Sequence, residues 1–230
     1  MLHNLIRSVM LVALFSLAGC AAAPKPLVGL VQGKEAETLQ SPISIAIRTS
    51  EGGRGGRGYL IFKRPDRFHL AILSPFGLTL MEVFSDGDRL TCLIPSKGVA
   101  YSGKIADLPA REGLRTWGLM RWVVEKPPVA GPVLKRDHVT ADGRRETVFY
   151  DDQGLVLRKE TEEGDRVVFS DYQVYDGVAF PSVMEISAVT GESVRITFDE
   201  PELNQPVEEG ALVPNLEGIT VLPFSAFNGF

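Results

Sequence analysis

The segment 67–86 constrains the fold more than any other part of the chain. It contains two runs rich in β-branched, aromatic and aliphatic residues, 67–74 and 79–86, separated by a Pro-Phe-Gly break. Proline cannot donate to a strand ladder and glycine permits positive φ, so the pattern predicts a hairpin that turns at this break. The turn carries Phe76 and Leu78. Exposing such a side chain forfeits about 1.5–3 kcal/mol of possible burial, so we expect the protein body, a partner or a membrane to cover the tip.

Both predicted strands carry apolar side chains on both faces. An antiparallel sheet with one solvated face normally alternates apolar and polar residues. Here Phe68, Leu70 and Ile72 oppose Ala71 and Leu73, and Leu80 and Phe84 oppose Met81 and Val83. The sheet is therefore expected to be covered on both sides or to line an apolar cavity.

Further strand patterns surround this hairpin. They predict strands at 43–49, 56–63, 89–94, 99–102, 146–151, 155–161, 166–174, 182–187 and 193–199, so that 56–103 forms an antiparallel meander. The glycine-rich stretch 52–58 lacks the Lys-Ser/Thr of a phosphate-binding loop and precedes a strand, so it is interpreted as a flexible hairpin loop. The segment 201–230 is proline-punctuated and poorly periodic, and its end, 219–230, fits either a packed terminal strand or a mobile tail.

One helix is predicted, over 111–125, ended by Pro127-Pro128. Its apolar residues spread around most of the circumference, which indicates an enclosed helix. They are Leu114, Trp117, Leu119, Met120, Trp122, Val123 and Val124. The pattern fits a plain core helix, and it also fits a helix that caps a cavity able to hold lipid.

The N-terminal sequence predicts export and lipidation. Arg7 precedes an apolar run, 9–18, which is shorter than the about 20 residues that a membrane-spanning helix needs. The following Leu17-Ala18-Gly19-Cys20 resembles a bacterial lipobox, which implies a signal peptide over 1–19 and a lipidated Cys20. An ordinary secretory signal is the alternative. Residues 20–40 would then be a tether, and Ala21 in place of aspartate favours the outer membrane.

Composition and motifs point to a binding protein without catalytic chemistry. The net charge of −5 provides no basic footprint for nucleic acid. Neither His69 nor His138 has a Cys or His partner at metal-ligand spacing, and the sequence lacks common catalytic motifs. Cys92 lies in an apolar strand and is expected to be a buried, inert thiol. We therefore expect neither an enzyme nor a cofactor or metal site.

Four segments together resemble the LolB family of the LolA/LolB superfamily of lipoprotein carriers. These are 67–77, which contains the Pro-x-Gly turn, 114–117 with its exit 127–131, and the later strands 167–172 and 181–186. The resemblance covers about 43–199. It implies a mainly β (α+β) fold over 41–200: an open, half-wrapped antiparallel barrel with a helical lid enclosing an apolar cavity, followed by a C-terminal segment, 201–230.

The resemblance also implies a non-enzymatic function. An outer-membrane-anchored lipoprotein facing the periplasm, expected as a monomer, would accept the acyl chains of lipoproteins from a LolA-type periplasmic carrier and insert them into the outer membrane. Phe76, with Leu78, would be the membrane-insertion loop. Ligand-binding residues would be Phe62, Phe68, Leu70, Ile72, Leu80, Phe84, Trp117, Met120 and Trp122. Alternatives are a carrier or sensor of another hydrophobic ligand, or a structural envelope lipoprotein.

Overall fold

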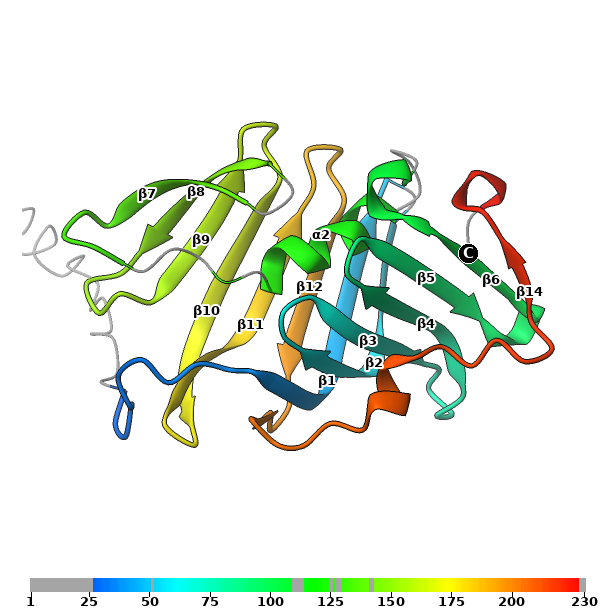
Figure 1. The fold of residues 1–230 in the computed structure, drawn as a ribbon, viewed down its shortest axis with the longest axis horizontal. Coiled ribbons are helices and arrows are strands. Elements are labelled where there is room, and N and C mark those ends of the chain that lie inside the picture. The colour runs from blue at the N-terminus through cyan, green and yellow to red at the C-terminus, as the bar shows by residue number, and fades with distance from the viewer. Residues whose placement is uncertain are drawn as a thin grey trace, which may run out of the picture.

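The computed structural model describes residues 27–50, 52–108, 114–124, 126, 130–140 and 143–227. The predicted signal peptide, Cys20, the first part of the tether, both ends of the predicted helix and the Pro127-Pro128 exit lie outside these residues. Within the described part of the chain, the fold is one large open sheet of 14 strands with a short α-helix lying across one face (Figure 1). The expected mainly β class with a helix is confirmed.

The strands follow the chain order closely. Their bounds are β1 Thr38–Thr49, β2 Gly52–Lys63, β3 Arg67–Leu73, β4 Thr79–Asp86, β5 Arg89–Ile94, β6 Val99–Lys104, β7 Lys135–Val139, β8 Arg145–Tyr150, β9 Val156–Thr161, β10 Arg166–Tyr175, β11 Val178–Ser187, β12 Ser193–Phe198, β13 Glu202–Leu203 and β14 Thr220–Leu222. The order across the sheet is β14-β6-β5-β4-β3-β2-β1-β12-β11-β10-β9-β8-β7, with β13 paired to β1. The pairs are antiparallel except β14–β6, which is parallel. The predicted meander is thus confirmed, and β7, a strand of mostly charged residues, was not predicted.

The glycine-rich stretch is a strand, so its interpretation as a loop was wrong. Residues 52–58 form the first half of β2 and pair with β1 from Thr49↔Gly52 to Ile43↔Gly58. The long, β-branched partner β1 extends the ladder, which outweighs the low strand propensity of glycine. At Gly58 glycine is required, because an added Cβ would lie 2.3 Å from the backbone oxygen of Ala71 on β3.

The helix α2, Leu114–Val124, lies across one face of the sheet, which we call the inner face. It contacts β11 near the middle of the sheet. Its side chains Trp117, Leu119, Met120, Trp122 and Val123 are each less than 5% exposed. They join strand residues in one continuous apolar core, so the expectation of an enclosed helix is confirmed.

The C-terminal segment is packed, which settles the alternative left open by its sequence. We call residues 201–227 the strap. Its 3-10 helix η3, Glu209–Leu212, contacts β3, then β14 pairs with the edge strand β6, and η4, Phe224–Ala226, contacts β6. In Figure 1 the strap runs past β3 and β4 to β14 at one end of the sheet. Phe224 and Phe227 are buried in the same core as α2, at 3% and 2% exposure.

Candidate functional site

The β3–β4 hairpin ends in a tightly hydrogen-bonded turn. The backbone N–H of Ser74 donates to the carbonyl of Leu78 at 2.8 Å, and the N–H of Gly77 donates to the carbonyl of Ser74 at 2.9 Å. The Ser74 hydroxyl accepts a further bond from the Leu78 N–H at 3.1 Å. Gly77 has φ +79°, a conformation that favours glycine. Its neighbour Phe76 is therefore held at the apex by a defined backbone.

The tip is apolar and exposed. Phe76 is 91% exposed, Leu78 69% and Leu80 50%. The described body of the protein therefore leaves these side chains uncovered. A cluster of this kind marks a contact surface for a membrane or a partner. Moving these exposed side chains out of water into an apolar environment would lower their free energy, and the protein body does not provide that burial.

The base of the hairpin is held by the strap on the outer face of the sheet. His69 Nδ1 lies 2.9 Å from the carbonyl oxygen of Ala211, and Nε2 lies 3.0 Å from Glu82 Oε1. The imidazole also stacks on Phe84, with ring centroids 4.1 Å apart. One side chain thus ties β3, β4 and the strap together.

An acidic residue of the strap adds an ionic contact to the same strand. Glu209 accepts a hydrogen bond from Arg67 Nη1 at 2.6 Å and pairs with Lys63 on β2. The hydrogen bonds from Lys63 and Arg67 lower the pKa of the Glu209 carboxyl to about 2. This ion pair is exposed, so it fixes geometry more than it contributes stability.

The inner face brings together most of the predicted ligand-binding residues. Each is buried in the core beneath or beside α2, at 9% exposure or less: Phe62, Phe68, Leu70, Ile72, Trp117, Met120 and Trp122. These side chains form a continuous apolar layer between the helix and the sheet. The layer is packed.

Leu80 and Phe84 lie apart from that set, on the outer face. The strand register pairs Leu70 with Val83 and Ile72 with Met81, so Met81 and Val83 point inward. A register irregularity between Ile72 and Leu73 accompanies this pairing. Alternation within one strand shows which of its residues share a face, but not which face of the neighbouring strand they join. That depends on the register, because a shift of one residue turns every side chain of a strand to the other face.

Two buried charged side chains anchor α2, and sequence reasoning missed both. The indole Nε1 of Trp122 donates to Glu146 Oε2 at 2.5 Å, and Lys159 Nζ donates to the backbone carbonyl of Trp122 at 3.0 Å. Glu146 is 4% exposed and Lys159 1%. Lys159 thereby satisfies a carbonyl in the last turn of the helix, a favourable place for a cation. A charged residue within a strand normally indicates a solvated face, so the sequence pattern was misleading here.

Among the described residues, no group of side chains could hold a metal ion. No cluster of three or more His, Cys, Asp or Glu side chains occurs among them. Cys92 is 1% exposed, and burial raises the pKa of its thiol to about 12, which agrees with an inert thiol.

None of the helices in the described ranges has the length and apolar character required to cross a bilayer.

Comparison with solved structures identifies the fold of this chain. A domain described as an outer membrane lipoprotein-sorting protein from Vibrio parahaemolyticus matches with a TM-score of 0.54 and 10% identity, over 76% of this chain and 89% of that chain. A LolA superfamily protein from Nitrosomonas europaea matches with a TM-score of 0.51 and 9% identity, over 78% and 91%. A DUF1329 family protein from Desulfovibrio piger matches with a TM-score of 0.56 and 10% identity, over 77% and 90%. At such identities these likenesses establish the fold alone, and it is LolA-like.

The family follows from the sequence model of the outer membrane lipoprotein LolB, which matches residues 39–200. The chain belongs to this family. Comparison with individual curated proteins gave no match. Members of the LolB family are non-enzymatic receptors of the outer membrane that insert lipoproteins into it, with cargo received from LolA. The resemblance, function and location expected from the sequence are thus confirmed. The family match favours this function over a carrier of another hydrophobic ligand or a structural envelope lipoprotein.

Proposed function

We propose that this receptor holds lipoprotein acyl chains between α2 and the inner face of the sheet, and delivers them to the bilayer through the β3–β4 hairpin. The exposed tip on its hydrogen-bonded turn carries the proposal. Phe76 is 91% exposed on a turn closed by three hydrogen bonds, so the chain presents an apolar side chain on a fixed support. A bilayer gives that side chain the burial that the protein does not.

The acyl site is proposed as the layer between α2 and the strands. This layer is apolar, continuous and covered by the helix, as a half-wrapped barrel with a helical lid requires. Because its side chains pack against one another, acyl chains would enter as α2 shifts away from the sheet. The bonds of Trp122 to Glu146 and Lys159 would then hold the lid closed in the empty receptor.

The remaining parts of the proposal concern attachment and assembly. Cleavage after residue 19 would leave a lipidated Cys20 as the anchor, and the residues between Cys20 and β1 would connect it to the folded part. More than one acyl chain on the anchor makes attachment stable, since each buried CH₂ contributes about 0.8 kcal/mol. We propose that the receptor acts as a monomer that meets a LolA-type carrier.

The test separates receiving cargo from inserting it. Phe76→Glu should still take an acylated peptide from a LolA-type carrier, while insertion into vesicles slows at least tenfold, because a carboxylate resists entry into the apolar part of a bilayer. Phe76→Leu should insert normally. Both variants should fold as the parent does, because the side chain is exposed.

A matched control is Val139→Glu, which places the same charge at a 57% exposed apolar position on β7. It should leave both steps unchanged. Normal insertion by Phe76→Glu, or an equal loss in Val139→Glu, would contradict the proposed role of the tip.

A further inference from the structure

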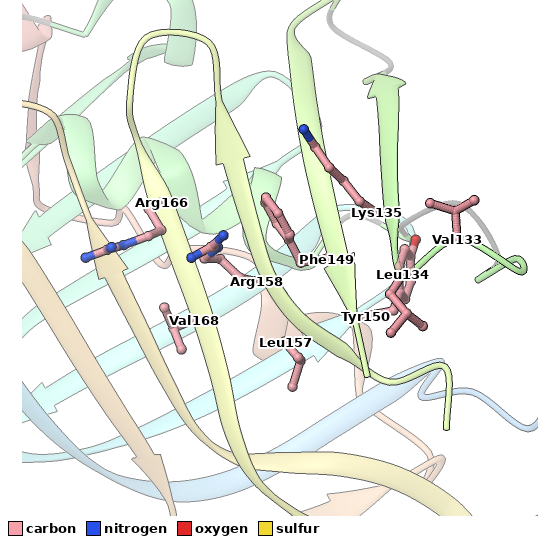
Figure 2. Close-up of a pocket in the computed structure, with 9 residues that line it drawn as sticks. All are labelled: Val133, Leu134, Lys135, Phe149, Tyr150, Leu157, Arg158, Arg166 and Val168. Carbon is pink, nitrogen blue, oxygen red and sulfur yellow. The ribbon is translucent and has the colours of Figure 1, made fainter. Parts of the chain in front are cut away.

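A basic groove lies on the outer face of the sheet at the end formed by β7–β10. It has a volume of about 670 Å³. The side chains that matter for its chemistry are Lys135, Phe149, Leu157, Arg158, Arg166 and Val168, and Figure 2 shows them with the rest of the lining. In the sheet order these strands lie on the far side of β1 from the β3–β4 hairpin. The groove is thus separate from the proposed insertion tip and acyl site.

Strand register places the central residues of the groove in one row. Lys135 of β7 pairs with Phe149 of β8, Phe149 with Arg158 of β9, and Arg158 with Val168 of β10. Paired residues project from the same face. The neighbouring residues of β8, β9 and β10 on the other face, Val148, Lys159 and Val167, are buried, and Lys159 contacts α2, so this row faces outward. Figure 2 shows the row crossing the strands.

The row has an aromatic centre with cations on both sides. Arg158 Cζ lies 4.0 Å from the centroid of the Phe149 ring, and Lys135 Nζ lies 5.8 Å from it. Arg158 Nε is 3.2 Å from Glu160 Oε1, so one carboxylate offsets one guanidinium. Neither Lys135 nor Arg166 has an ion-pair partner among the described residues. On a chain with a net charge of −5, this is a local surplus of positive charge.

The groove therefore combines two chemical demands. Its cations favour a negatively charged group, whereas Phe149, Leu157 and Val168 offer apolar surface that a bare inorganic anion would not cover. Leu157 is 43% exposed. The volume falls within the roughly 300–1,000 Å³ of small-ligand pockets. A single amphiphile with an anionic head meets these demands.

We propose that this groove binds one anionic phospholipid, with the phosphate held between Lys135 and Arg166 and the first acyl methylenes on Phe149, Leu157 and Val168. The location of the family at the outer membrane puts phospholipid within reach of the site. The contact is additional to the hairpin and does not depend on the transfer function. It gives the receptor a lipid-sensitive surface at the opposite end of its sheet.

The experiment uses the chain from residue 20 with Cys20→Ala, so that neither the apolar signal peptide nor an anchor lipid competes. Calorimetric titration would compare dihexanoyl phosphatidylglycerol below its micelle concentration with dihexanoyl phosphatidylcholine and inorganic phosphate. We expect binding of phosphatidylglycerol alone, weakened at least tenfold by Lys135→Glu combined with Arg166→Glu. Both positions are exposed, and thermal unfolding would confirm that the variant is folded. The matched control, Lys97→Glu with Lys104→Glu, changes the charge equally at exposed sites of η1 (Pro95–Lys97) and β6 and should bind as the parent does.

Several results would overturn the proposal. Equal binding of phosphatidylcholine would remove the role of the cations, and equal binding of inorganic phosphate would reduce the groove to an anion site. Unchanged affinity in the doubly substituted variant would place the lipid elsewhere. If this variant kept its lipid affinity but lost cargo uptake from a LolA-type carrier, the groove would be a protein-docking surface. Normal transfer with lost lipid binding supports the proposal and leaves the transfer function standing.

Discussion

Gly58 shows how much a single residue decides in this sheet. It lies where the predicted loop 52–58 overlaps the predicted strand 56–63, and its backbone pairs with Ile43 on one side and Ile72 on the other. The close approach of Ala71 on β3 leaves no room for a side chain. Gly58 thus serves the close packing of β2 against β3.

Gly58→Ala should destabilise the protein by about 2 kcal/mol or more, because its Cβ would meet a rigid backbone oxygen. Gly53→Ala is the control, since the nearest atom to its added Cβ, the oxygen of Ile47, is 3.8 Å away. Urea unfolding of both variants measures the difference. Equal stability of the two would show that the ladder relaxes around the new methyl group.

Among the elements, those with a strong local pattern were predicted from sequence and those with tertiary causes were not. The hairpin strands and α2 were found because apolar periodicity and turn residues define them locally. The short strand β7 lacks that periodicity, since Lys135–Val139 is mostly charged. The strap has many prolines and little regular structure, so its docking depends on contacts such as that of His69 with Ala211, which no local pattern reveals.

The pH dependence of strap docking follows from Glu209. Its pKa in the folded protein, about 2, lies below the ordinary value of 4.5, so its contribution is present above pH 4.5 and is lost as the pH falls toward 2. The protection of the amides of residues 209–212, which is the observed exchange rate compared with the intrinsic rate at the same pH, should therefore decrease across that interval. Glu209→Gln should remove this pH dependence and exchange faster at neutral pH, whereas Glu208→Gln should behave as the parent does. An unchanged exchange profile in Glu209→Gln would show that the ion pairs do not hold the strap.

At the scale of the whole molecule, the strap completes the sheet. It covers the edge of β6 with β14 and adds Phe224 and Phe227 to the core, although both lie beyond the residues that match the family model. Covering an edge strand prevents its free N–H and C=O groups from pairing with another chain. Sequence reasoning identified the family domain but left the role of this segment open, because three spaced phenylalanines do not show which part of the protein they pack against.

Truncation after residue 218 should lower stability by several kcal/mol and cause concentration-dependent association. Removing a buried phenylalanine side chain costs about 3–5 kcal/mol, and the truncation also exposes the β6 edge. Phe224→Ala combined with Phe227→Ala should show the loss of stability with less association. Denaturant unfolding and light scattering would measure the two effects. A monomeric, fully stable truncated chain would refute this role of the strap.

The pairing of β1 with β12 has a consequence for how the protein folds. Ile43 meets Phe198 across this junction, so the two halves of the sheet are joined by residues from distant parts of the sequence. Strands β2 to β6 can assemble hairpin by hairpin, whereas this junction forms only after β12 has been synthesised. Contacts between distant residues slow folding, because closing a long loop costs entropy before the contact stabilises it. We therefore expect formation of the β1–β12 junction to limit the folding rate and to leave the two halves of the sheet unjoined until late in folding.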